Sequence, residues 1–195
     1  MIRVLVIDDH EPSRRLAIQT LRLGGYEIAA EGSSGKAAPA LALVAAADLL
    51  VMAAGLADRD GIAAARDIMQ ASPLPIVLIT SHADPSTVKR ATEAGVMSYL
   101  VKPLRAAELA PAIELAVGRF RDVTSLHEEI AALKLTLEER KLIERAKGML
   151  MEQRHLSEER AYSLMKKASM NMRKPMADIA QAILLAGGLL GDSIR

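Results

Sequence analysis

The chain has no cysteine among its 195 residues. This absence excludes disulfides, thiolate catalysis and zinc sites with sulfur ligands. The N-terminal stretch MIRVLVIDDH contains only a short apolar run and has no signal-peptide layout. No apolar segment is long enough to cross a bilayer. We therefore expect a cytoplasmic protein without a membrane partner.

The sequence also lacks the residue patterns of most enzyme classes. It has no nucleophile with a neighbouring base, no triad of metal ligands and no glycine-rich loop that could hold phosphates. The histidines, which we expect on the surface, are isolated in sequence: His10, His82, His127 and His155. We therefore expect no enzymatic activity.

The composition is that of a soluble globular protein, with 51% hydrophobic and 25% charged residues. Its length allows one or two domains. The formal net charge is only +1, but residues 140–174 hold ten Lys and Arg against four Asp and Glu. This basic segment is where we expect a nucleic-acid contact, and a solvated surface with no binding role is the alternative.

Short apolar runs alternate with helical patterns over residues 1–118. The runs cover residues 2–7, 28–30, 49–53, 76–80 and 98–101, and the helical patterns cover 13–23, 36–46, 62–71 and 86–94. The nearly continuous apolar character of the runs indicates strands that are buried on both faces. The alternation predicts an α/β domain, a (βα)5 doubly wound parallel sheet of the flavodoxin type.

Polar side chains follow several of these predicted strands. Asp8 and Asp9 follow the first strand, Thr80 ends the fourth, and Lys102 follows the fifth. Because ligands bind beyond the carboxyl ends of the strands in such a sheet, we expect these groups to share one pocket. The third strand ends at Ala53, which brings only a methyl group to the same edge.

A helical pattern continues from about residue 107 past residue 137. Within it, apolar residues recur at spacings of three and four: Val123, Leu126, Ile130, Leu133 and Leu137. This spacing is typical of a coiled-coil seam. We predict a helical linker over residues 119–137 that carries a dimer seam. The alternative is a helix that lies on its own domain.

Residues 138–195 show three short amphipathic helical patterns, which predict a small three-helix domain. The first stripe comprises Leu142, Ala146, Met149 and Leu150, with Gly148 inside it. The second follows the N-cap residue Ser157 and comprises Ala161, Leu164, Met165 and Ala168. The third opens at Pro175 and comprises Met176, Ile179, Ala180, Ile183 and Leu184, before a predicted end at Gly187–Gly188.

The (βα)5 layout and the segments VLVIDDH, IVLITS and YLVKP together resemble the receiver domain of two-component response regulators. In that family an acidic pair after the first strand helps to hold Mg²⁺, matching Asp8 and Asp9. A Thr or Ser after the fourth strand and a Lys after the fifth contact the phosphoryl oxygens, matching Thr80 and Lys102. Tyr99 matches the aromatic residue that reorients on activation.

In the receiver family, a carboxylate at the end of the third strand accepts a phosphoryl group from a partner histidine. Counting back seven residues from Asp60, as the family spacing requires, reaches Ala53. A methyl group can neither attack phosphorus nor coordinate a metal ion. We do not expect Asp58 or Asp60, which lie further along the loop, to replace the acceptor. We hypothesise that regulation does not pass through an aspartyl phosphate.

Loss of the acceptor also weakens the metal site, because that carboxylate normally supplies one oxygen ligand. Asp8 and Asp9 remain as candidate Mg²⁺ ligands, but we expect no resident cofactor. We interpret the pocket of Asp8, Asp9, Thr80 and Lys102 as vestigial, held together by local ion pairs. Two alternatives are a site for another small ion and a surface that a partner protein reads.

The segment LIERAKGMLMEQRHLSEERAYSLMKKASMNMRKPMADIAQAIL resembles the ANTAR domain, a three-helix RNA-binding module of bacterial transcription antiterminators. The resemblance covers about residues 138–186. It implies binding to a pair of hairpins in a leader transcript, which prevents an intrinsic terminator from forming.

The charged residues that we predict to contact RNA are Arg145, Lys147, Lys166, Lys167, Arg173 and Lys174. Tyr162 is the one aromatic residue of this module, and it is either a stacking platform for a base or a core filler. Gly148 costs about 1 kcal/mol relative to Ala in a helix interior. This cost indicates close approach, either by a packed helix or by RNA.

The leading interpretation is a homodimeric, RNA-binding antitermination regulator with a degenerate receiver domain. A sensor protein or a histidine kinase would control it. Two alternatives are a DNA-binding transcription factor that uses the helical tail, and an interaction adaptor with no role in nucleic-acid binding.

Overall fold

The structure, a computed structural model, describes residues 1–81 and 84–191, with side chains up to residue 186. His82 therefore lies outside the described residues. The chain divides into two compact units, the first covering Met1–Ser125 and the second beginning at Leu126. Helix α5 (Ala106–Arg154) contributes residues to both units. The predicted boundaries at residues 118 and 137 both fall inside this helix.

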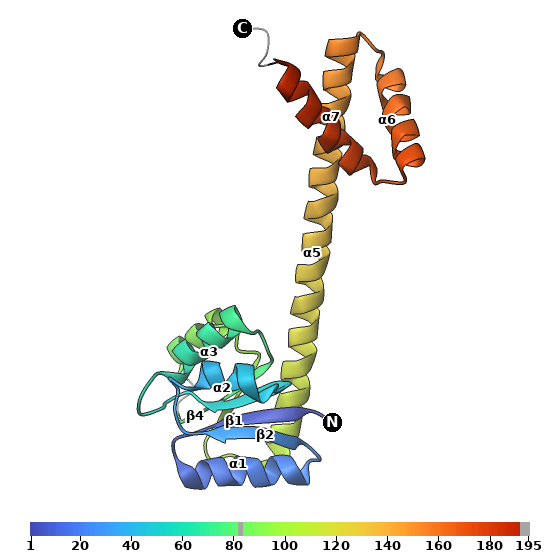
Figure 1. Cartoon of the computed structure of the whole chain (residues 1–195). Helices are drawn as coiled ribbons and strands as arrows, with labels where there is room; N and C mark the ends of the chain where they lie inside the picture. Colours follow the sequence, from blue (N-terminus) through green and yellow to red (C-terminus); the bar gives the residue numbers. More distant parts are fainter. Residues whose placement is uncertain (82–83, 192–195) are drawn as a thin grey trace. The chain divides into compact units, whose positions relative to one another are not determined.

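Five strands form one parallel sheet in the first unit (Figure 1). They are β1 (Arg3–Ile7), β2 (Glu27–Gly32), β3 (Leu49–Ala53), β4 (Ile76–Thr80) and β5 (Ser98–Val101). Their order is β2-β1-β3-β4-β5, so the direction of winding switches between β1 and β3. The predicted (βα)5 doubly wound fold is confirmed.

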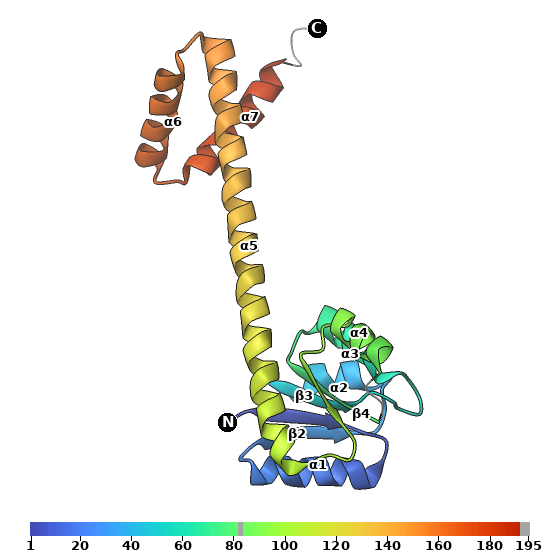
Figure 2. The same cartoon turned by 180° about the vertical axis from the view of Figure 1, so that it is seen from behind.

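Helices cover both faces of this sheet (Figures 1 and 2). They are α1 (Glu11–Leu23), α2 (Ala38–Ala45), α3 (Gly61–Ala71), α4 (Pro85–Glu93) and the first part of α5. In β1, Leu5 and Ile7 pack in the core shared with α2, α3 and α4. Val4 and Val6 pack in the core shared with α1 and α5. Successive strand residues point to opposite faces, so burial on both sides requires the nearly continuous apolar runs of the sequence.

The edge strand β2 is longer than the predicted strand at residues 28–30. It includes Glu27 and Glu31, both of which are exposed. An edge strand has one unpaired side, so charged residues are tolerated there and mask the apolar signal. The helices start where side chains cap them: Asp60 accepts the N–H of Ile62 at 2.8 Å at the start of α3.

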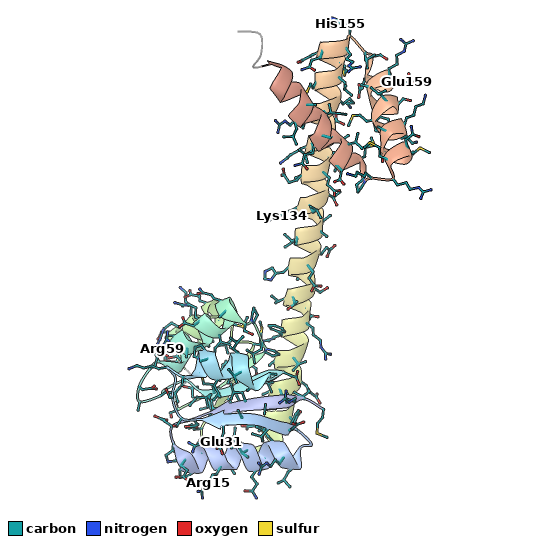
Figure 3. All side chains as sticks on the ribbon, viewed as in Figure 1. Arg15, Glu31, Arg59, Lys134, His155 and Glu159 are labelled. Carbon is teal, nitrogen blue, oxygen red and sulfur yellow. The ribbon has the colours of Figure 1, made fainter. Side chains whose placement is uncertain are left out.

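The second unit is a bundle of the C-terminal part of α5 with α6 (Glu158–Met172) and α7 (Met176–Gly191). Its core comprises Ala146, Leu150, Ala161, Met165 and Ala180, with Ile183 and Leu184 packed against it. Most residues of the three predicted stripes lie in this core or beside it. Figure 3 shows His155 in the turn that joins α5 to α6. His10, His127 and His155 are exposed, as predicted.

Three expectations for this unit are wrong. The first helix is not short and separate, because it is the end of the 49-residue α5. Leu164 is 45% exposed and lies outside the buried stripe, because Ala161 and Met165 alone fill the narrow face that two neighbouring helices can cover. Helix α7 does not end at Gly187–Gly188 but continues to Gly191. Each glycine costs a helix only about 1 kcal/mol relative to Ala, which weakens a helix without ending it.

Among the described residues, no helix combines the length and the apolar character that a membrane span requires.

Candidate functional site

The receiver-like pocket is built around Asp8, which directly follows β1 and is only 2% exposed. Its Oδ2 atom lies 3.1 Å from Nζ of Lys102, and its Oδ1 atom accepts the backbone N–H of His10 at 3.0 Å. The backbone N–H of Lys102 donates to the carbonyl of Thr80 at 2.8 Å. The structure thus brings Asp8, Thr80 and Lys102 together, and the Asp8 carboxylate is paired within the chain.

Asp9 is turned to a different partner. Its Oδ2 atom accepts the backbone N–H of Ala57, in the loop between β3 and α3, at 2.8 Å. The two acidic residues therefore serve separate contacts. Among the described residues, no group of three or more His, Asp or Glu could hold a metal ion. Mg²⁺ can bind through one or two carboxylates and several waters, so Asp8 and Asp9 are the only groups of this pocket that the sequence offers as its ligands, and Asp8 is already paired with Lys102.

Ala53 ends β3 and is buried. The chain turns tightly behind it, because a Cβ atom on Gly61 would lie 2.1 Å from the carbonyl oxygen of Ala53. Position 53 therefore brings only a methyl group to the carboxyl end of β3.

The other carboxylates of the β3–α3 loop fasten that loop to its surroundings. Asp58 accepts hydrogen bonds from the Ser34 hydroxyl at 2.6 Å and from the Gly35 N–H at 2.9 Å. These bonds hold the pKa of Asp58 below its ordinary value. Asp60 caps α3 and forms an ion pair with Arg90 of α4. Both groups are engaged in structural contacts, which does not favour either as a replacement acceptor.

Tyr99 lies on β5 with 43% of its surface exposed. It lines a small apolar cavity together with Thr80 and with Val88 of α4.

Lys147 lies in an ion-pair cluster of the second unit. Its Nζ atom is 2.7 Å from carboxylates of both Glu144 and Glu158, and its side chain is only 12% exposed. These two carboxylates, Glu144 first, raise the pKa of Lys147. Lys147 thus joins α5 to the start of α6, and its ammonium is already engaged by two carboxylates of the chain. The sequence pattern did not predict this ion pair, because Glu158 lies eleven residues from Lys147, across a turn.

Three predicted RNA contacts lie on α6 or at its C-terminal end. Tyr162 and Lys166 share one side of the helix, four residues apart, and Arg173 is the left-handed C-cap residue that follows the helix; all three are exposed. Tyr162 is 47% exposed and does not belong to the bundle core, so it is not a core filler. Lys167 lies on another side of the helix. Lys174 is exposed in the turn after α6, where its carbonyl accepts the Ser169 hydroxyl at 2.6 Å.

The predicted dimer seam forms an exposed apolar face on α5. Its residues are 39% to 63% exposed and belong to no core cluster of the described chain: Val123, Leu126, Ile130, Leu133 and Leu137. Figure 3 shows Lys134, which flanks this face, projecting from α5. The single chain therefore leaves the seam without an apolar partner among its described residues.

Two domain families match the chain. Residues 4–114 match the response regulator receiver domain, and residues 131–184 match the ANTAR domain. A crystal structure of the signal receiver domain of a modulated diguanylate cyclase from Desulfovibrio desulfuricans G20 aligns with a TM-score of 0.58 and 27% identity. That alignment covers 62% of this chain and 97% of the other.

Two curated relatives are transcriptional regulators by name. Transcriptional regulatory protein LiaR of Bacillus subtilis is 39% identical over 118 residues, which are 60% of this chain and 56% of LiaR. Transcriptional regulatory protein PdtaR of Mycobacterium tuberculosis is 42% identical over 191 residues, covering 98% of this chain and 93% of PdtaR. Because likeness to PdtaR extends across both domain matches, the chain belongs to the response regulators that join a receiver domain to an ANTAR domain.

Proposed function

We propose that this response regulator binds paired hairpins in leader RNA as a dimer and so prevents transcription termination. The observation that carries the proposal is the exposed stripe of Tyr162 and Lys166 on α6, with Arg173 exposed at the C-cap of that helix. Cations bind RNA phosphates, and unpaired loop bases stack on aromatic or guanidinium planes. The stripe offers both chemistries within one helix of the ANTAR bundle.

The seam on α5 supports a parallel dimer. If Val123 and Ile130 occupy the a positions of a heptad, Leu126 and Leu133 occupy the d positions. β-Branched residues at a with leucine at d favour two parallel strands. Glu129 then falls at g and Lys134 at e, so Glu129 of one copy faces Lys134 of the other with opposite charge.

A dimer places two ANTAR modules on one molecule. When one module has bound the first hairpin, the second binds at a high effective concentration, which raises the overall affinity without any new contact. This arrangement suits an RNA with two hairpins in tandem.

The receiver pocket supports control by partner binding rather than by phosphorylation. Ala53 cannot accept a phosphoryl group, and Lys102 is paired with Asp8. We infer that a sensor protein or a histidine kinase acts by occupying the receiver surface, and that the pocket operates without a resident Mg²⁺. Incubation with acetyl phosphate and Mg²⁺, followed by intact-mass measurement, should show no added phosphoryl group.

The RNA function is tested by selection from a pool of RNAs with two tandem hairpins and randomised loops. The full-length protein should enrich particular loop sequences. It should bind the recovered RNA more tightly than single-hairpin RNA and far more tightly than duplex DNA at the same salt concentration. Preferential binding to duplex DNA would instead support a DNA-binding regulator.

A further inference from the structure

Gly148 lies inside α5, in the part that belongs to the ANTAR bundle. Apart from its two chain neighbours and the nearby backbone of its own helix, nothing in the described chain lies within 4 Å of the position that a Cβ atom on Gly148 would take. Packing within the bundle therefore does not require glycine at this position. The helix nevertheless carries a residue that costs it about 1 kcal/mol relative to Ala.

The helix geometry places Gly148 away from the bundle core. Ala146 and Leu150 are both buried in that core, and each is two residues from Gly148. With 3.6 residues per turn, two residues correspond to a rotation of about 200°. Gly148 therefore lies on the outer face of α5, in line with Leu137, Lys141 and Glu144, which precede it at helical spacing.

A shallow hollow lies along this outer face, lined by Leu137, Arg140, Lys141, Glu144 and Arg145. Glu144 is paired with Lys147, and Lys141 is paired with Glu138 at 2.7 Å. Within the described residues, Arg140 and Arg145 form no ion pair. The face thus combines two uncompensated guanidinium groups with a glycine that leaves the helix backbone uncovered.

We propose that an RNA sugar–phosphate backbone lies against this face, contacting Arg140 and Arg145 and approaching the helix closely at Gly148. Guanidinium groups bind phosphate through paired hydrogen bonds, and glycine is the residue that permits close backbone approach. A second copy of the chain contacts Leu137 through the proposed seam, but it fits the rest of the face less well, because a two-fold axis there would set arginines against arginines. This inference rests on the proposed RNA function and assigns part of its contact surface to α5.

Gly148→Ala in the full-length protein is the decisive variant. Alanine meets no atom of the described chain and favours helix, so the melting temperature should be unchanged or higher. Affinity for the selected tandem-hairpin RNA should nevertheless fall at least tenfold. Gly118→Ala is the matched control, because Gly118 also lies in α5 with nothing within 4 Å of its Cβ position, and this variant should bind RNA like the wild type.

Arg145→Ala should also lower the slope of log affinity against log salt concentration by about one, as expected for the loss of one phosphate contact. Equal RNA affinity of Gly148→Ala and Gly118→Ala would overturn the inference. So would weakened self-association of Gly148→Ala in sedimentation with unchanged RNA affinity per dimer, because the occupant would then be a second copy. If the wild type itself selects no RNA from the hairpin pool, the proposed function fails together with this inference.

Discussion

The charged groups of the receiver unit and of the ANTAR unit are used in different ways. In the receiver pocket, Asp8 is paired with Lys102, and Asp9 and Asp58 hold backbone N–H groups of neighbouring loops. On the outer surfaces of the ANTAR unit, the predicted RNA contacts Lys166 and Arg173 form no ion pair within the described residues. Paired charges hold a structure together, whereas unpaired cations remain available to an anionic partner.

This difference shows which part of the two-component chemistry the chain retains. The receiver unit keeps the receiver fold with Ala53 at the end of β3, and Asp8 and Lys102 form an ion pair in its pocket. The output unit keeps exposed cations and an exposed aromatic residue. Five variants can break or sharpen the comparison. The first four run from the largest expected effect to the smallest, and the fifth separates two roles of one lysine.

Leu133→Glu should have the largest effect. It places like charges opposite each other in the proposed seam, so the protein should become monomeric in sedimentation, and affinity for tandem-hairpin RNA should fall about 100-fold as the avidity is lost. Leu135→Glu is the matched control, because Leu133 and Leu135 are each 63% exposed but only Leu133 lies on the seam. Equal behaviour of the two variants would show that the seam does not join two copies.

Lys102→Met should destabilise the receiver unit by about 3 kcal/mol, because it leaves the buried Asp8 carboxylate without its cation. The double variant Asp8→Asn, Lys102→Met should recover much of that loss, since it removes both charges. Chemical denaturation of the single and double variants measures the coupling. Strictly additive effects would contradict a structural ion pair, and RNA affinity should remain at the wild-type value throughout.

Tyr162→Ala should lower RNA affinity about tenfold, since stacking on an aromatic residue contributes about 1–3 kcal/mol per base. Tyr162→Phe keeps the ring and should retain most of the affinity. Because Tyr162 lies outside the bundle core, neither variant should lower the melting temperature appreciably. If Tyr162→Ala binds RNA as tightly as the wild type does, Tyr162 is not part of the RNA-binding surface.

Glu158→Gln should have the smallest effect, and its effect should depend on pH. The Lys147 ammonium holds the pKa of Glu158 below its ordinary value of 4.5. A carboxylate with a lowered pKa in the folded state stabilises the fold above that ordinary value, and the contribution is lost as the pH falls through the folded-state pKa. The melting temperature of the variant should lie below that of the wild type at neutral pH, and this difference in melting temperature should disappear in acid.

Lys147→Met separates the two roles considered for this lysine. If Lys147 only joins α5 to α6, this variant should lower the melting temperature but leave the salt dependence of RNA binding unchanged. A decrease of about one in the slope of log RNA affinity against log salt concentration would instead show that Lys147 contacts a phosphate.

Much of the fold could be predicted because its signals are local. The strands β3 and β4 are buried on both faces, and the continuous apolar runs at residues 49–53 and 76–80 predict this burial directly. Helix ends were less predictable, since the helix pattern of the linker and that of the first bundle helix join in one helix, α5. Leu164 is exposed because few helices surround α6. The number of neighbouring helices cannot be predicted from the local spacing of apolar residues.

The sequence by itself determined that position 53 can accept no phosphoryl group, because a methyl side chain has no oxygen in any fold. It also determined the seam spacing and the basic excess of residues 140–174. Only the tertiary structure decided which cations are available. Lys147 and Arg145 are alike in sequence as charges beside Ala146, but only Lys147 meets the carboxylate of Glu158, where α6 packs back on α5. Pairing depends on distance in space, and the fold sets that distance.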